Sequence, residues 1–291
     1  MFFRILTIIA PVFVCAAVGF IWARMGKRYE TKFVTRLIMN VGAPCLVVSA
    51  FNRTDIDRGA LADVGLGAVC VTALVALAAL IALRALRFDI RTYFPSIAFQ
   101  NTGNMGMPLC LFAFGPEGLA LGSVVFMWVA MANFTIGISI VTGEKSLRRL
   151  TRMPLIYATI FAVFLAITGW KLPGWVANTV DLLGGLTIPL MLLTLGVSLA
   201  TLGVKKLGRS TLIAFLRIGF GFAAGLLVAK LLGLTGATRG VIILQASMPS
   251  AVFNYLMAAR YERGADDVAG AVTMSTLMSL VVLPLVLWYL L

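Results

Sequence analysis

Two short polar stretches interrupt long apolar runs of the sequence. The first, residues 99–109, reads FQNTGNMGMPL and combines two asparagines and a threonine with glycine and proline. The second, residues 245–254, reads QASMPSAVFN and is polar on both sides of Pro249. Amides and hydroxyls can donate and accept hydrogen bonds, while glycine and proline favour breaks in a helix. The pattern predicts two interrupted helices with hydrogen-bonding groups at their breaks.

The candidate ligand-binding residues come from these two stretches. They are Asn101, Thr102, Asn104, Met107, Pro108, Gln245, Ser247, Pro249 and Asn254. Where two interrupted helices cross, the amino ends of half-helices present unpaired N–H groups and positive dipole ends, which favour a carboxylate over a cation. The alternative interpretation of residues 99–109 is a polar helix–helix contact built on small residues.

Two ionisable residues are accessory candidates. Arg217 lies inside the apolar run 210–232, about 12 Å along a helix from the basic edge of that run. Its side chain can either extend to the membrane interface or attract an anion inside the membrane. Asp63 lies near the opposite edge and is a possible accessory group at the external mouth. Neither a carboxylate nor a histidine falls at the expected crossing, so we expect no proton relay there.

Enzymatic and metal-binding functions find no support in the sequence. The chain has no histidine, and it has no G-x-S-x-G or G-x-x-x-x-G-K motif. Its four cysteines lie within apolar runs without C-x-x-C spacing and are interpreted as packing residues. We therefore expect no enzymatic activity, no cofactor and no metal ion.

The composition shows where these polar stretches must reside. Hydrophobic residues make up 61% of the 291 positions, charged residues 12%, and the mean hydropathy is +1.02. Such a chain is typical of an all-α integral membrane protein surrounded by the lipid bilayer, with about ten spans. The predicted spans are 3–23, 32–51, 61–86, 92–114, 119–142, 153–170, 178–202, 210–232, 238–260 and 265–290.

The basic residues predict the orientation in the membrane. Of the 24 Lys and Arg residues, 17 fall in the loops after odd-numbered spans and six on the other side. Because cytoplasmic loops carry the excess of positive charge, we expect a multi-pass protein of the inner membrane with both termini outside. The net charge of +13 is explained by topology, so we expect no nucleic-acid partner.

Prolines inside spans two, four, seven and nine suggest an internal repeat. Pro44 and Pro189 are 145 residues apart, and Pro108 and Pro249 are 141 apart, each close to half of the chain. Two halves of five spans, residues 1–145 and 146–291, must enter the membrane from opposite sides. The sequence therefore predicts two inverted five-span repeats with interrupted fourth and ninth spans.

The stretch Asn101-Thr102-Gly-Asn-Met105-Gly106-Met-Pro108-Leu109 resembles the N-T-x-x-M-G-x-P-L segment of the auxin efflux carrier family. The resemblance implies the crossover fold of bile-acid and sodium-proton transporters, with a scaffold of spans one, two, six and seven. The remaining spans three to five and eight to ten would form a mobile transport domain, and the scaffold would form a homodimer interface. The resemblance also implies a small carboxylate substrate, such as malonate, malate or an auxin-like acid.

The resemblance assigns individual residues. Asn101 occupies the position of the family's substrate-contacting asparagine, and Pro249 matches the first of two prolines in the ninth span. Asn254 stands where plant members have the second proline, and the long central loop of the plant proteins is missing, as in the compact prokaryotic form.

These observations favour a secondary carrier of small organic anions with an elevator-like alternating-access mechanism. A non-transporting membrane receptor or sensor for a small anion on the same scaffold is the alternative, and a channel is a third.

Overall fold

The computed structural model describes residues 1–54, 57–143, 154–203 and 206–291, and within these ranges the chain is helical apart from short connections. Seven of the described helices are long and apolar enough to cross a membrane. The prediction of an all-helical, multi-pass membrane protein is confirmed. The arrangement of ten spans as two inverted repeats stays a prediction, and the expected boundary at residues 145 and 146 lies outside the described residues.

The first half of the chain contains α1 (Phe2–Arg24), α2 (Thr31–Leu37), η1 (Ile38–Gly42), α3 (Ala43–Arg53), α4 (Arg58–Ala85), α5 (Ile90–Ala98), η2 (Thr102–Gly106), α6 (Met107–Ala132), η3 (Asn133–Gly137) and α7 (Ile138–Thr142). The second half contains α8 (Pro154–Thr168), α9 (Gly174–Gly185), α10 (Thr187–Thr201), α11 (Leu207–Leu231), α12 (Gly236–Ala246), α13 (Val252–Arg260) and α14 (Ala265–Leu290). The η segments are single π-turns that continue into the following α-helix.

Two of the π-turns are explained by prolines. Pro44 is the second residue of α3 and Pro108 the second residue of α6, each directly after a π-turn. Proline has no N–H to bond the carbonyl four residues earlier, and its ring crowds that carbonyl. A widened turn relieves the crowding without ending the helix.

Helix α6 reverses its direction at Gly115. This residue has φ 68° and ψ −160°, which is a conformation essentially reserved for glycine. The two arms then run side by side, because Gly118 and Gly122 approach Cys110 while Gly103 approaches Phe126. The predicted spans 92–114 and 119–142 leave a loop at residues 115–118. In the structure the chain instead reverses at a kink centred on Gly115.

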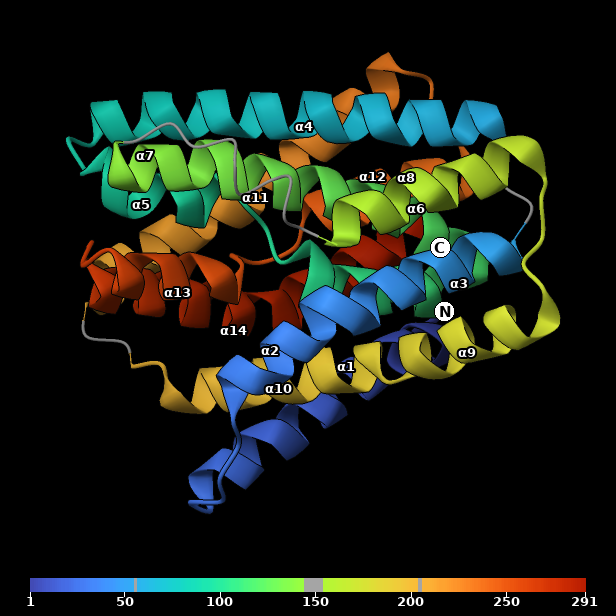
Figure 1. Cartoon of the computed structure of the whole chain (residues 1–291). Helices are drawn as coiled ribbons and strands as arrows, with labels where there is room; N and C mark the ends of the chain where they lie inside the picture. The colour runs from blue at the N-terminus through green and yellow to red at the C-terminus, as the bar shows by residue number, and fades with distance from the viewer. Residues whose placement is uncertain (55–56, 144–153, 204–205) are drawn as a thin grey trace.

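The helices pack in two groups (Figure 1). In the first group α1 lies along α10, and α3 packs on α8 and α9. In the second group α4, α5, α6, α11, α12 and α14 pack on one another, and α13 joins through α14 and α5. Glycines bring α1 and α10 into backbone contact, since Gly19 abuts the backbone of Leu193 and Gly196 abuts the backbone of Ala16.

The two ends of the chain lie at the same end of the molecule, on the right of Figure 1. The connections after α1, after α10 and after α13 lie at the opposite end. Because the chain begins and ends at the same end of the molecule, it must run between the two ends an even number of times. The reversal at Gly115 is one of its changes of direction.

Candidate functional site

The two polar stretches form a crossing of unwound chain. Helix α5 ends at Ala98 and η2 begins at Thr102, while α12 ends at Ala246 and α13 begins at Val252. Residues 99–101 and 247–251 run antiparallel, with the Asn101 N–H donating to the Pro249 carbonyl at 2.7 Å and the Ala251 N–H donating to the Phe99 carbonyl at 3.2 Å. The two interruptions expected from sequence are confirmed. Each segment satisfies the backbone groups that the other leaves open, as a break inside a membrane requires.

A cavity of about 90 Å³ lies beside the crossing, between the two groups of helices. Its lining is neutral, with polar side chains from both groups and no charged side chain among the described residues. The polar lining residues are Thr31, Thr35, Gln100, Asn101, Thr102, Asn104, Asn133, Thr194 and Ser198. The apolar part of the lining comes mainly from residues around Phe126, Phe134 and Phe253.

The amino ends of two half-helices meet at this cavity. Residues 102–104, the start of the helix that continues into α6, and residues 251–253, the start of α13, are both part of the lining. No side chain caps the amino end of α13 at Ala251. The N–H groups of Thr102, Asn104 and Asn254 are bonded within the chain, so the two ends contribute mainly a partial positive charge of about half an elementary unit per helix to the same space.

Asn101 has a divided role at this cavity. Its Oδ1 accepts a hydrogen bond from the Asn104 N–H at 3.2 Å and so caps the helix that begins at Thr102. Its Nδ2 is buried and has no partner among the described residues. Because the cap fixes which end of the amide is the oxygen, the open group is a donor, which suits an acceptor such as a carboxylate oxygen.

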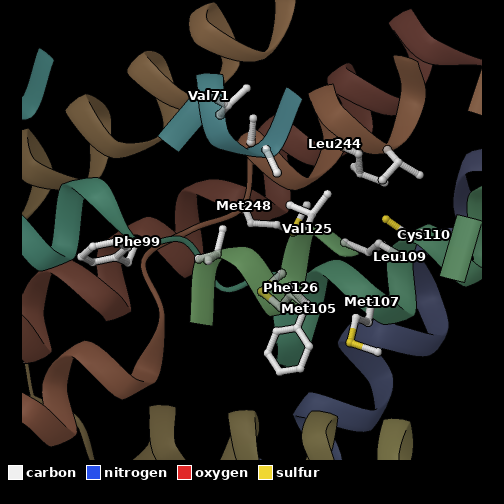
Figure 2. Close-up of a cluster of buried hydrophobic side chains, with 14 of the residues drawn as sticks. Val71, Phe99, Met105, Met107, Leu109, Cys110, Val125, Phe126, Leu244 and Met248 are labelled. Atoms are coloured by element: carbon white, nitrogen blue, oxygen red, sulfur yellow. The ribbon is translucent and has the colours of Figure 1, made fainter. Parts of the chain in front are cut away.

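The remaining candidates divide between the cavity and the interior. Thr102 and Asn104 line the cavity. The fully buried Met107 lies in an apolar cluster with Met105, Leu109 and Phe126 (Figure 2). Pro108 is also buried and is not part of the lining, seven residues after Asn101.

The three candidates around the second break lie in the interior and bond to other parts of the chain, although Gln245 Oε1 has no partner among the described residues. The Pro249 carbonyl accepts from the other unwound segment. The Gln245 Nε2 donates to the Gly122 carbonyl at 3.3 Å, and the Ser247 hydroxyl donates to the Ile243 carbonyl at 2.7 Å. None of the three lines the cavity.

Asn254 holds the crossing together. Its Nδ2 lies 2.9 Å from the carbonyls of both Pro95, in the last turn of α5, and Phe99, directly after α5, and 3.1 Å from the Ser250 hydroxyl. Its Oδ1 accepts from Asn133 Nδ2 at 3.0 Å. Asn254 is buried and lies behind the lining, so its amide adds a side-chain link between the end of α5 and the start of α13 to the backbone hydrogen bonds of the crossing.

Neither accessory candidate is part of the cavity lining, although Arg217 Nη1 lies 3.5 Å from Oε1 of the lining residue Gln100. Arg217 is fully buried and donates to the carbonyls of Ile97 and Ala246, so the expected extension to the membrane interface is wrong. The carbonyls at the two helix breaks hold the guanidinium in place of water or lipid headgroups. Asp63 is exposed on α4 and is not part of the cavity lining.

Comparison with known proteins places the chain in a family. The model of the family described as "Membrane transport protein" matches residues 138–288, about half of the chain. The chain belongs to this family. The resemblance to the auxin efflux carriers is thereby confirmed, and the family is one of transporters rather than enzymes.

Relatives within the family support the same class. An "Uncharacterized transporter" of Methanothermobacter thermautotrophicus is 27% identical over 95% of both chains. A second "Uncharacterized transporter", from Methanocaldococcus jannaschii, is 29% identical over 66% of this chain and 65% of its own. A protein of Rhizobium meliloti named "Putative malonate transporter" is 22% identical over 94% of this chain and 91% of its own.

In this member of the family, sequence reasoning missed several lining residues. Asn133 was not recognised, although an asparagine within an apolar run is a signal that marks an internal hydrogen bond. Thr31, Thr35, Thr194 and Ser198 gave no signal, because hydroxyls are common in membrane helices and can bond to their own backbone. Gln100 lies within the polar stretch 99–109 but was not among the candidates, and the structure places it in the cavity lining.

Proposed function

We propose that the chain is a secondary carrier of small carboxylate anions, which bind at the cavity beside the crossing. The observation that carries this proposal is the meeting of two uncapped or partly capped helix amino ends with the unpartnered Nδ2 of Asn101. Two amino ends contribute roughly one positive charge in total, which matches the single negative charge of one carboxylate group. A cation would be repelled by this positive charge and would find no carboxylate among the described lining residues to bind it.

The cavity volume supports a small substrate. A water molecule needs roughly 10–15 Å³ of such space, so about 90 Å³ holds the equivalent of roughly six to nine non-hydrogen atoms. Malonate and similar short carboxylates are in this range, and the name of the R. meliloti relative agrees with it. An auxin-like acid with a fused aromatic ring is larger and needs the cavity to widen.

The packing supports alternating access. We propose that α1–α3 and α8–α10 form the scaffold and that α4–α7 and α11–α14 move against it. The glycine-mediated backbone contacts between α1 and α10 favour a rigid scaffold, whereas the cavity lies where the two groups face each other. A homodimer through the scaffold and a place in the inner membrane with both termini outside belong to the same proposal.

The lining favours an inward-facing state. Thr31 and Thr35 lie at the start of α2, Ser198 lies in the last turn of α10, and Leu256 lies in the second half of α13. These helix ends adjoin the loops that carry most of the basic residues, and such loops are typical of the cytoplasmic side.

The test is flux through purified protein in proteoliposomes. Monocarboxylates and dicarboxylates of increasing size are offered singly, with and without sodium and pH gradients. We expect saturable uptake of the smaller anions that is accelerated by the same anion on the opposite side. Binding without flux would replace the carrier with a receptor, and unsaturable flux without acceleration would replace it with a channel.

A further inference from the structure

Arg217 lies between the carboxyl ends of two half-helices. Its Nη1 donates to the carbonyl of Ile97 in the last turn of α5, and its Nη2 donates to the carbonyl of Ala246, the last residue of α12, at 2.8 Å. The side chain comes from the middle of α11 and is fully buried. One guanidinium therefore joins two helix ends that belong to different interrupted spans.

The charges at this point balance without a carboxylate. Two ion pairs join described residues, Arg53 with Asp181 and Lys206 with Asp267, and neither includes Arg217. Each helix carboxyl end carries roughly half a negative charge, so α5 and α12 together offset about one positive charge. A buried arginine without such compensation would be strongly destabilising.

A glycine makes this arrangement possible. Gly221 lies one turn after Arg217 on α11, and a Cβ at this position would collide with the Ala246 carbonyl oxygen and with Nη2 of Arg217. The absence of a side chain lets α12 approach α11 closely enough for the hydrogen bond to form. Arg217 and Gly221 are thus two parts of one contact.

The two faces of the crossing are electrically opposite. The carboxyl ends of α5 and α12 meet at Arg217, while the amino ends of η2–α6 and of α13 meet at the cavity. The residues between them are few, because residues 99–101 and 247–251 are all that separates the two faces. The carbonyl of Ile97, which Arg217 bonds, is only four residues before Asn101. A displacement of Arg217 should therefore shift Asn101 as well.

We propose that Arg217 is a positioning residue, whose charge holds the carboxyl ends of α5 and α12 together and thereby fixes the cavity on the other side of the crossing. It does not contact the substrate. Its effect on substrate affinity rests on the proposed function, whereas its effect on the crossing does not. An apolar side chain cannot take this role, because it can neither bond the two carbonyls nor offset the negative ends of the two helices.

Amide hydrogen exchange of the purified protein tests the effect on the crossing. Arg217→Met keeps most of the apolar stem without charge or donors, Arg217→Lys keeps the charge but not the fork of donors, and Arg217→Ala leaves a void. Lys230→Gln removes an exposed charge from the same helix and is the matched control. We expect exchange in peptides covering residues 97–101 and 246–251 to be roughly tenfold or more faster in the Met and Ala variants, intermediate in the Lys variant and unchanged in the control.

Rescue by a free cation separates charge from packing. Guanidinium at low, non-denaturing concentration should slow exchange again in Arg217→Ala, which has space for it, and should leave Arg217→Met unchanged. Gly221→Ala keeps the arginine but displaces it, so it should accelerate exchange in the same two segments. This variant also provides a test if Arg217→Ala does not fold.

The proposal is overturned if Arg217→Met protects both segments as well as the parent does. The same conclusion follows if guanidinium has no effect on a folded Arg217→Ala protein. If the parent protein binds no carboxylate at all, the proposed function fails while the exchange results still decide the role of Arg217. If it does bind one, Arg217→Lys should weaken the affinity several-fold and Lys230→Gln should not.

Discussion

Asn101 and Asn254 are both buried asparagines beside an unwound segment, yet their amides have different surroundings. All the hydrogen-bonding capacity of the Asn254 amide is directed at protein groups, namely two carbonyls, a hydroxyl and a second asparagine. Asn101 uses its oxygen for a helix cap and leaves its Nδ2 open beside the cavity. Substitutions at the two positions should therefore separate stability from binding.

Asn101→Ala should weaken carboxylate binding by about tenfold to a hundredfold, because a hydrogen bond to a charged group contributes about 1.5–3 kcal/mol. Asn101→Asp keeps the oxygen that caps the helix but replaces the donor by a negative charge, so it should weaken binding further. Isothermal titration with the transported anion measures both. Asn178→Ala, on the exposed surface of α9, is the control and should bind like the parent. Normal affinity in well-folded Asn101→Ala would remove the binding site from this crossing.

Asn254→Ala should lower the free energy of unfolding by about 2 kcal/mol, because it removes the buried hydrogen bonds of the amide and leaves Asn133 Nδ2 without its partner. Denaturation of the purified variant in detergent measures this. Combining it with Asn133→Ala should give less than the sum of the two single effects, since both substitutions remove the same hydrogen bond. Full additivity would show that the two amides act independently.

At the scale of helices, the interruptions could be predicted from sequence, while the contacts across them could not. Glycine, proline and amides marked residues 99–109 and 245–254 because these residue types are unusual within apolar spans. The hydrogen bond between Asn133 and Asn254 joins positions 121 residues apart, and no local pattern encodes such a contact. Arg217 was misplaced for a related reason, since its distance from the basic edge along α11 gave no indication of the carbonyls that surround it.

The reversal within α6 depends on one glycine. Gly115→Ala should destabilise the protein by about 1–3 kcal/mol, because its φ of 68° with ψ −160° is strained for any residue with a Cβ. Gly219→Ala is the matched control, since Gly219 is helical and a Cβ there meets no neighbour. That control should be neutral or slightly stabilising. Thermal denaturation compares the two, and equal melting temperatures would contradict the proposed strain.

On the scale of the whole molecule, the two groups of helices and the common end for both termini agree with a carrier that has an even number of spans. Composition predicted the membrane environment and the helical class. The side of the membrane rests on basic residues alone, and part of that count, in residues 144–153, falls outside the described structure.

Single-cysteine labelling in a cysteine-free background tests the orientation. We expect an impermeant reagent applied to intact cells to label Lys171→Cys, which follows α8, and to spare Lys27→Cys, which follows α1. Permeabilised cells should allow labelling at both positions and provide the control. Labelling of Lys27→Cys in intact cells would reverse the orientation, and with it the assignment of the cavity to the cytoplasmic side.

Transport of a fully ionised anion should vary only weakly between about pH 6 and pH 8, because the described cavity lining holds no carboxylate and the chain has no histidine. Initial rates in proteoliposomes with equal pH on both sides measure this. Asp63→Asn tests the exposed carboxylate on α4 and should leave the pH profile unchanged. A tenfold change in rate across this range would indicate a protonation step that the cavity does not explain.

The buried charge of Arg217 also determines where electrical work is done. Arg217 lies on α11, in the group of helices that we propose to move, so its positive charge travels with the empty site, whereas a bound anion of one charge offsets it. The membrane voltage therefore acts mainly on the unloaded step, and that work amounts to about 2.3 kcal/mol per 100 mV if the whole voltage is crossed. In a cell with a negative interior, the voltage would draw the empty carrier to its inward-facing state, ready to load an anion from the cytoplasm.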